Sequence, residues 1–289
     1  MIIKDRDSRE EDIKELKRLL SLKDLTPKQK FLIERELYSI LKGKDGEDDA
    51  AYYINFYYAN SKNWAVIHDL RIQHNGRSVQ IDHILINRCF DIYVLESKNY
   101  RYGIRITEQG EFEAIYGKHY IGIPSPIEQN KRHIKLLEEL IREEDLLPRR
   151  LGFKIRPRFF NYVLISPKAI IKRPKNRKYR FPNVIKADQL TTTIERNAEE
   201  ISDLDAVFCF MKISSFSVVE DFARRLVAYH SPIKIDWKRK FGIESNKDQK
   251  RYFCYRCGKN VSEKVAKFCW KNPVKFQGRV FCIECQKRI

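Results

Sequence analysis

Apolar residues recur along the chain at two spacings, one typical of helices and the other of strands. In residues 8–21 they recur every three to four positions, which predicts a helix. Thr26-Pro27 then supplies a hydroxyl cap and a first-turn proline, so a second helix is expected to begin there. Gly43 is expected to end that helix, and a third helix is expected to open at Asp45. The chain therefore begins with predicted helices.

Strand patterns follow these helices. Residues 64–72, 79–86 and 92–95 are rich in apolar and β-branched side chains, and the Asn75-Gly76 pair between the first two is a hairpin-turn signal. Residues 101–106 and 112–120 are predicted to form a hairpin around Gly110, and residues 159–165 a buried strand. Helices are predicted over 127–141, 188–200 and 218–227. Residues 207–213 fit a strand or a helix equally well. This mixture indicates an α/β fold.

The composition fits a folded protein without a membrane segment. Apolar residues make up 43% and charged residues 33% of the 289 positions, which allows a packed core and excludes wholesale disorder. No stretch approaches the roughly 20 apolar residues of a membrane-spanning helix. The charged N-terminal residues 1–6 do not resemble a signal peptide, so we expect a cytoplasmic protein. In that reducing compartment, the seven cysteines are not expected to form structural disulfides.

The positive charge of the chain lies in its second half. Lys and Arg number 57 and Asp and Glu 39, which gives a net charge of +18. Residues 1–150 are balanced, whereas residues 151–230 carry +7 and residues 231–289 carry +11. Such an excess favours nucleic acid as the partner. The densest basic run is expected to contact the nucleic-acid backbone, with a solvated loop as the alternative; it comprises Lys172, Arg173, Lys175, Arg177 and Lys178.

The segment 80–98 is predicted to be a hairpin that gathers acidic side chains. If its turn is centred on Cys89, Asp82 lies opposite Glu96, and Lys98 shares their face because side chains alternate along a strand. Two facing carboxylates repel each other, and a divalent cation such as Mg²⁺ relieves the repulsion. The alternative is an edge aspartate beside an exposed Glu96–Lys98 ion pair.

These residues also resemble a known family. Asp82 followed by Glu96-Ser97-Lys98 is similar to the PD-(D/E)xK nuclease signature, with Ile81 in place of its proline. Over roughly residues 40–165 the chain resembles the nuclease-related domain, NERD, in four ordered segments: Gly46-Glu47, Ile81-Asp82-His83-Ile84, Val94 to Tyr100 with Gly103, and Pro126 with Gln129 and His133.

The resemblance implies a fold and a set of site residues. The fold would be a restriction-endonuclease-like mixed sheet flanked by helices. Asp82 and Glu96 would bind Mg²⁺ or Mn²⁺, Lys98 would be the catalytic lysine, and Glu47 would be the acid from a helix that completes the site. Gln129 would support the substrate or the attacking water.

Two C-x-x-C pairs near the C-terminus predict a structural zinc site. They are separated by 24 residues and comprise Cys254, Cys257, Cys282 and Cys285. Each pair can present two thiolates to one tetrahedral Zn²⁺. Cys269 is expected to be a packed free thiol, or else to replace one of the four. Basic and aromatic side chains alternate around the pairs, which suits nucleic-acid binding as well as a small core.

Together these features predict a metal-dependent nuclease, with DNA favoured over RNA as its substrate and no membrane partner. One alternative is a non-catalytic nucleic-acid-binding or scaffold protein on the same fold. Another is a zinc-dependent interaction protein with an unrelated core. The predicted organisation is a helical N-terminal extension (1–42), the nuclease-related domain (43–230), a polar linker (231–249) and a zinc-ribbon-like module (250–289).

Overall fold

The computed structural model describes residues 1–200, 202–243 and 252–288, without the side chains of residues 42–48, 203–205, 208 and 211. The chain divides into two compact units. The first comprises Met1–Ile13 and Arg35–Lys234, and the second comprises Lys14–Glu34 and Ile235–Ile289. The predicted domain boundaries remain predictions.

A six-stranded mixed sheet forms the centre of the first unit. Its strand order is β1-β2-β3-β4-β10-β12, and the β2–β3 and β3–β4 pairs are antiparallel while the other neighbours are parallel. The strands are β1 (Ile2–Lys4), β2 (Trp64–His74), β3 (Arg77–Asn87), β4 (Asp91–Lys98), β10 (Arg158–Ile165) and β12 (Val184–Lys186). Asn75 and Gly76 both have positive φ, at 49° and 71°, so they form the predicted hairpin turn between β2 and β3.

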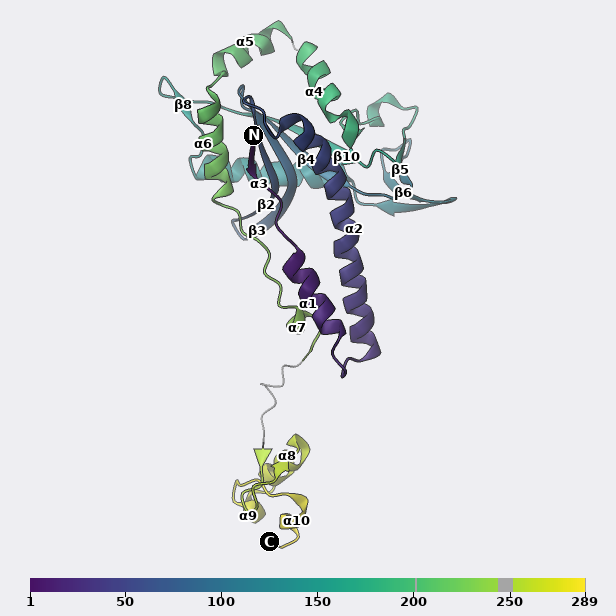
Figure 1. Ribbon diagram of the computed structural model, residues 1–289, viewed down its shortest axis with the longest axis vertical. Helices are drawn as coiled ribbons and strands as arrows, with labels where there is room; N and C mark the ends of the chain where they lie inside the picture. Colours follow the sequence, from purple (N-terminus) through teal and green to yellow (C-terminus); the bar gives the residue numbers. More distant parts are fainter. Residues whose placement is uncertain (201, 244–251, 289) are drawn as a thin grey trace. The chain divides into compact units, whose positions relative to one another are not determined.

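Helices cover both faces of this sheet, and its strands lie between α6 and α2 (Figure 1). One core cluster joins the strands to α3 (Pro126–Glu143) and α6 (Phe216–Val227), through Leu137 and Phe222 among others. A second cluster joins the opposite face to α2 (Pro27–Tyr58) and α4 (Leu190–Glu199), through Ile54 and Ile194. The mixed sheet flanked by helices that the resemblance implied is confirmed.

A smaller sheet follows β4 in the chain, in the order β11-β5-β6-β7. Its strands are β5 (Gly103–Ile106), β6 (Phe112–Tyr116), β7 (His119–Ile123) and β11 (Ile170–Lys172). The strand expected over 112–120 is thus two strands, because Gly117 adopts a φ of 59° and turns the chain between them. The first unit also contains β8 (Arg149–Arg150), β9 (Phe153–Lys154), α5 (Asp203–Lys212) and the 3₁₀ turns η1 (Arg177–Tyr179) and η2 (Ala187–Gln189).

One expectation about the N-terminal helices is wrong. Thr26 caps α2 as predicted, because its Oγ1 accepts a hydrogen bond from the N–H of Gln29 at 3.2 Å. However, α2 runs without a break through Gly43, which was expected to end it, so the third helix expected to open at Asp45 is part of α2. A glycine inside a helix costs only about 1 kcal/mol, and the packing of Ile54 against the sheet favours one continuous helix. Residues 207–213, which fitted either type of structure, are helical up to Lys212.

The expectation that the chain lacks disulfides is wrong for one pair. Cys89, in the turn between β3 and β4, is bonded to Cys209 of α5. Their Cα atoms are 5.1 Å apart, although 120 residues separate them in the sequence. Nothing in the spacing of these two cysteines indicated the pairing, because it depends on how α5 returns to the sheet.

The second unit contains α7 (Trp237–Lys240) and a small C-terminal module. The module is built from β13 (Tyr252–Phe253), β14 (Asn260–Val261), α8 (Glu263–Lys271), α9 (Pro273–Phe276) and α10 (Ile283–Gln286). Helix α1 (Glu10–Leu20) spans the division between the two units. Within the described ranges, no helix has the length and apolar character needed to cross a membrane.

Candidate active site

The hairpin of β3 and β4 brings the predicted acids to one end of the main sheet. Ile84 pairs with Val94, as predicted, and the ladder of paired residues ends at His83 and Leu95. Asp82 is the next residue of β3, and Glu96 is the next residue of β4. The predicted register is therefore observed as far as the ladder extends, and the predicted Asp82–Glu96 pair lies one residue beyond it.

The carboxylate of Asp82 continues the pairing where the backbone ladder stops. Its Oδ2 accepts a hydrogen bond from the backbone N–H of Ser97 at 2.7 Å. Ser97 lies between Glu96 and Lys98, so this bond ties Asp82 to the segment that carries the other two predicted residues. It holds the middle of β3 to the end of β4, at the point where the two strands begin to separate.

Strand β2 is irregular at Asp69, the position opposite Asp82. This residue has a φ of 52°, which is uncommon for a residue other than glycine. As a result, Ile67 and Leu70, on either side of the irregularity, belong to the same core cluster. An ordinary strand would place residues three apart on opposite faces. The alternation of side chains between the two faces of β2 therefore changes beside Asp82.

Glu96 is buried, with only 3% of its surface exposed. Its Oε1 accepts a hydrogen bond from Nε2 of Gln129 at 2.7 Å and lies 2.7 Å from Nζ of Lys98. Its Oε2 lies 3.3 Å from Nδ1 of His133, but neither atom has an aligned hydrogen-bond partner among the described residues. Burial by itself raises the pKa of Glu96, whereas His133 and Lys98 lower it, and the balance lies below the ordinary value. Glu96 is thus a buried carboxylate whose Oε2 faces His133 without an aligned hydrogen bond among the described residues.

Lys98 is a cation in this site. Burial lowers the pKa of Lys98, but the adjacent carboxylate of Glu96 and the charge of Asp82 raise it, and the net shift is upward. The side chain is only partly exposed, so its charge is little screened by water. Such an ammonium group can stabilise negative charge on an anionic substrate.

Helix α3 supplies the side chains opposite β4. Gln129 and His133 are four residues apart, so they lie on one face of the helix and both reach Glu96. Asn130 is fully buried and fixes the helix, because its Nδ2 donates to the carbonyl oxygens of Val94 at 2.8 Å and Tyr162 at 3.2 Å. Sequence reasoning did not identify Asn130 as a positioning residue, although a lone amide on an apolar helix face is a signal for one.

The four predicted zinc ligands converge in the C-terminal module. The Sγ atoms of Cys254, Cys257, Cys282 and Cys285 all lie within 4.8 Å of one another. The Cys257 and Cys282 sulfur atoms are 3.7 Å apart, close to the roughly 3.8 Å edge of a tetrahedron with Zn–S bonds of about 2.3 Å. The set therefore fits a structural Zn²⁺ site.

The charges of these thiols also favour a bound cation. Burial raises the pKa of Cys254, but backbone N–H groups lower it, and the net value is about 6. The hydrogen bond with Cys282 and burial both raise the pKa of Cys285, to about 12. Four thiolates this close would repel one another, and a divalent cation removes that repulsion. Cys269 lies outside the cluster: its Sγ accepts hydrogen bonds from the Phe281 N–H and the Gln286 amide, both at 3.3 Å. This arrangement fits the packed thiol that was expected.

Comparison with known families finds a match that includes the β3–β4 hairpin. Residues 42–167 match the model of the nuclease-related domain, NERD. This part of the chain is similar to a nuclease-related domain. The match contains Asp82, Glu96, Lys98 and Gln129, and it agrees with the extent of 40–165 that the sequence predicted. Comparison with curated proteins and with solved structures finds no match.

The predicted helix acid of the NERD domain, Glu47, lies in α2, and its side chain is outside the described residues. Asp49, two residues later, accepts a hydrogen bond from the Ser166 hydroxyl at 3.2 Å. Ser166 follows Ile165, which pairs with Lys98 across β10 and β4. The helix therefore passes the same end of the sheet as Lys98.

The predicted nucleic-acid-binding run lies on β11 and the loop that follows it, and its members are held in different ways. Arg173 is exposed, but its guanidinium donates to the carbonyl oxygens of Arg180 at 2.6 Å and Phe181 at 3.0 Å. Lys172 donates to the Tyr120 hydroxyl at 3.0 Å. Lys178 lies over the ring of Tyr179. Lys175 and Arg177 complete the run and have exposed side chains. Arg173 holds the loop, whereas the exposed members remain predicted phosphate contacts.

Proposed function

We propose that the NERD domain is a metal-dependent nuclease that hydrolyses phosphodiester bonds, with DNA as the favoured substrate. The observation that carries this proposal is the buried, ionised carboxylate of Glu96, which lies between the cationic side chain of Lys98 and the amide of Gln129. A buried carboxylate oxygen without an aligned hydrogen bond is costly unless it has a further partner. A metal ion would be that partner.

The residues at this site suit Mg²⁺. Mg²⁺ prefers one or two carboxylates together with water and phosphate oxygens, and Asp82 and Glu96 are the acids tied to this strand end. When bound, the ion would supply Lewis acidity and a water of lowered pKa. Mn²⁺ has the same preference for oxygen ligands.

The other side chains would act directly on the substrate or water. Nζ of Lys98 would release its contact with Oε1 of Glu96 in part and donate to a non-bridging oxygen of the scissile phosphate. Gln129 would hold the second hydrogen of the attacking water or orient the carboxylate of Glu96. Glu47 would add a third carboxylate from α2.

The zinc module would increase affinity for the nucleic acid. Both acids of the module form ion pairs, Glu263 with Lys267 and Glu284 with Lys259. A groove of about 310 Å³ between the first cysteine pair and the segment after α9 is lined by aromatic and cationic side chains, among them Tyr255, Arg256, Lys275, Arg279 and Phe281. Cations neutralise phosphates, and exposed rings stack on bases.

Cleavage by purified, zinc-loaded protein tests the proposal. Labelled single- and double-stranded DNA and RNA are incubated with Mg²⁺, Mn²⁺, Ca²⁺ or no added divalent ion. We expect cleavage of DNA in Mg²⁺ or Mn²⁺ only, and a rate at least about 100-fold lower for Glu96→Gln. Glu113→Gln is the matched control, because this carboxylate pairs with Arg105 on the smaller sheet, away from the site.

Two outcomes would contradict the proposal. If Glu96→Gln cleaved as fast as wild type, the activity would belong to another site or to a contaminant. If wild type bound nucleic acid but cleaved nothing in any metal, the chain would be a binding or scaffold protein built on the NERD fold.

A further inference from the structure

Two histidines face each other inside the main sheet, behind the candidate active site. His68 of β2 and His83 of β3 are paired residues, and both are fully buried. Their Nδ1 atoms are 2.7 Å apart and their rings meet edge to face. They lie on the face covered by α2, where their neighbours are otherwise mostly aliphatic or aromatic. Polar rings at this depth are costly unless every ring nitrogen is bonded.

Both outer ring nitrogens are also bonded, and they reach two different elements. Nε2 of His83 lies 3.0 Å from Oγ of Ser97 in β4. Nε2 of His68 lies 2.9 Å from Oδ1 of Asn55 in α2. A four-residue chain therefore runs from β4 through β3 and β2 to α2. We call it the histidine chain: Ser97, His83, His68 and Asn55.

The hydrogen bonds of this chain have one direction. The amide oxygen of Asn55 can only accept, so Nε2 of His68 carries the proton, and the facing Nδ1 of a neutral His68 must accept. Nδ1 of His83 then donates, which leaves its Nε2 to accept from the hydroxyl of Ser97. The donor and acceptor in each of the three bonds determine those in the next, so the histidine chain has a single protonation pattern.

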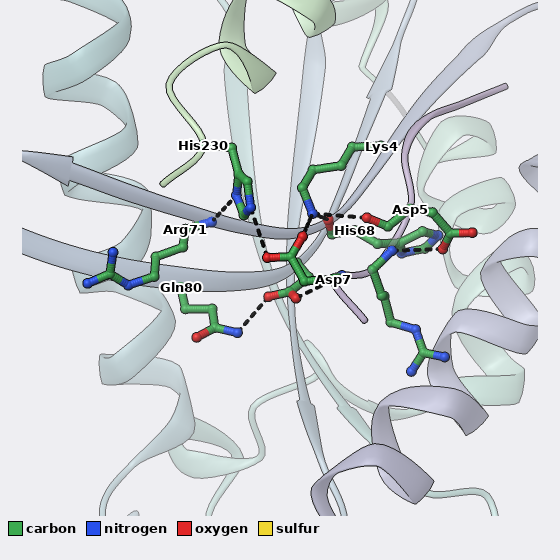
Figure 2. A network of polar contacts seen from close by, with 9 residues as sticks. Lys4, Asp5, Asp7, His68, Arg71, Gln80 and His230 are labelled. Atoms are coloured by element: carbon green, nitrogen blue, oxygen red, sulfur yellow. Dashed lines mark hydrogen bonds and ion pairs between the residues drawn. The ribbon is translucent and has the colours of Figure 1, made fainter. Parts of the chain in front are cut away.

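The charged groups around His68 are compatible with two neutral rings. Nζ of Lys4 donates to the backbone oxygen of His68 at 3.2 Å, and Asp5 lies nearby (Figure 2). Burial outweighs these charges and lowers the pKa of His68 to about 4, while Asp5 raises it and Arg6 and Lys4 lower it. The ring is therefore neutral near pH 7.

One end of the histidine chain, Ser97, lies in β4, the strand that carries Glu96 and Lys98. Ser97 is flanked by Glu96 and Lys98, and its N–H donates to Asp82. Its hydroxyl points to His83 on the opposite face. The other end is Asn55, eight residues after Glu47 in the same helix.

We propose that His83 and His68 are positioning residues, which hold the segment of Asp82, Glu96 and Lys98 in register with helix α2. The inference rests on the proposed function. The two rings act through Ser97 and do not touch the substrate. Their effect is to set where the two carboxylates lie relative to each other and relative to the helix.

The test uses a variant pair that preserves packing. A single His83→Leu change leaves the ring nitrogen of His68 without its partner, so this variant is expected to misfold. The double variant His68→Leu/His83→Leu replaces both polar partners with apolar side chains and is designed to fold. His74→Gln is the control, since this histidine bonds to Glu143 at the far end of the hairpin. Ser97→Ala removes the hydroxyl at the catalytic end alone.

Three measurements are made on the zinc-loaded 289-residue chain and on those variants that keep the wild-type unfolding midpoint. Single-turnover cleavage in Mg²⁺ is compared with the Kd for the same DNA in Ca²⁺, and Mn²⁺ affinity is measured by calorimetry after subtracting the signal of Glu96→Gln. For the double variant and Ser97→Ala we expect a rate about 10- to 100-fold lower, because misplacement of reacting groups by about 1 Å has that effect. Mn²⁺ affinity should fall at least tenfold, while the DNA Kd changes less than twofold.

The outcomes separate this inference from the proposed function. If wild type cleaves nothing but the double variant still loses Mn²⁺ affinity, the nuclease proposal fails and the positioning role stands. If the folded double variant keeps both its rate and its Mn²⁺ affinity, the histidine chain is only part of the core and the inference is wrong. A wild type that neither cleaves nor binds Mn²⁺ overturns it as well.

Discussion

At the scale of single residues, the state of each ionisable group in this protein follows from its burial and from its specific neighbours. Glu96 keeps its charge because Lys98 and His133 lie beside it. His68 stays neutral because burial lowers its pKa to about 4. Arg173 bonds to backbone carbonyls, although its sequence context predicted a phosphate contact. Position in the fold, more than residue type, decides what each group does.

The neutral state of His68 predicts a loss of stability in acid. The unfolded chain binds a proton with a pKa of about 6.5, whereas the folded chain does so only near pH 4. The free energy of unfolding is therefore not reduced by His68 above about pH 6.5, and it falls as the pH drops toward 4. At 1.36 kcal/mol per pKa unit, the total reduction is about 3 kcal/mol.

Denaturant unfolding between pH 4 and 7.5 measures this effect. The free energy of unfolding of wild type should fall relative to that of His68→Leu/His83→Leu, which lacks both rings. If the two proteins lose stability in parallel over this range, the buried histidines are not the acid-sensitive groups.

At the scale of elements, close backbone approaches fix how the smaller sheet joins the candidate site. Gly103 opens β5, five residues after Lys98, and pairs with Ile170 of β11. Its φ is 121°, and a Cβ atom there would lie 1.9 Å from the carbonyl oxygen of Ile170. Only glycine fits, so this position holds the two strands together.

Gly103→Ala should therefore destabilise the protein by more than about 2 kcal/mol, through backbone strain and loss of the β5–β11 pairing. Gly122→Ala is the matched control, because its added Cβ meets no atom within 4 Å and its φ is not positive. Thermal unfolding of the two variants measures the difference. Equal midpoints would show that β11 can move aside without cost.

Elements with local partners were predictable from the sequence, and those with distant partners were not. The β2–β3–β4 hairpins follow from Asn75-Gly76 and from alternating apolar residues, since neighbours in the chain pair with each other. The parallel pairing of β4 with β10 and the Cys89–Cys209 bond depend on long-range contacts that no local pattern encodes.

The candidate site divides in the same way. The register of one hairpin was enough to bring Asp82 near Glu96 and Lys98. Whether a buried polar residue finds a partner is decided by tertiary packing, so the partners of Asn130 and of the two facing histidines were visible only in the structure. The resemblance to a family, rather than any pattern of spacing, pointed to Gln129.

At the scale of the whole molecule, chemistry and affinity are assigned to different parts of the chain. The NERD match covers residues 42–167. Acidic and basic residues balance over residues 1–150, which include most of this match. The net charge of +18 lies beyond residue 150. An acidic site in a neutral region gains little from electrostatic attraction to a polyphosphate, so the basic half should supply the affinity.

Zinc content tests the first part of this division. Purified protein should contain one zinc per chain, and Cys254→Ser or Cys285→Ser should lose it together with the fold of the C-terminal module. Cys269→Ser should keep the metal, because the Cys269 thiol bonds to Phe281 and Gln286 instead. Loss of zinc in Cys269→Ser with retention in Cys254→Ser would show that the ligand set is different.

Salt dependence tests the second part. Removal of residues 250–289 should weaken DNA binding and flatten the plot of log K against log salt. The slope should change by about 0.9 for each duplex phosphate that the module neutralises, or by about 0.7 for each phosphate of a single strand. Binding is measured with Glu96→Gln so that no cleavage occurs. An unchanged slope would indicate that the zinc module contacts a protein.

The central claim is that Asp82 and Glu96 together hold the ion that enables cleavage. Its most direct test is the single-turnover rate of DNA cleavage as a function of Mg²⁺ concentration, for wild type and for Asp82→Asn. The amide keeps the size of the side chain and an acceptor for the Ser97 N–H, but it removes the charge. We predict a saturating rate for wild type and a rate at least about 100-fold lower for Asp82→Asn at every Mg²⁺ concentration. Equal rates for the two proteins would contradict the account.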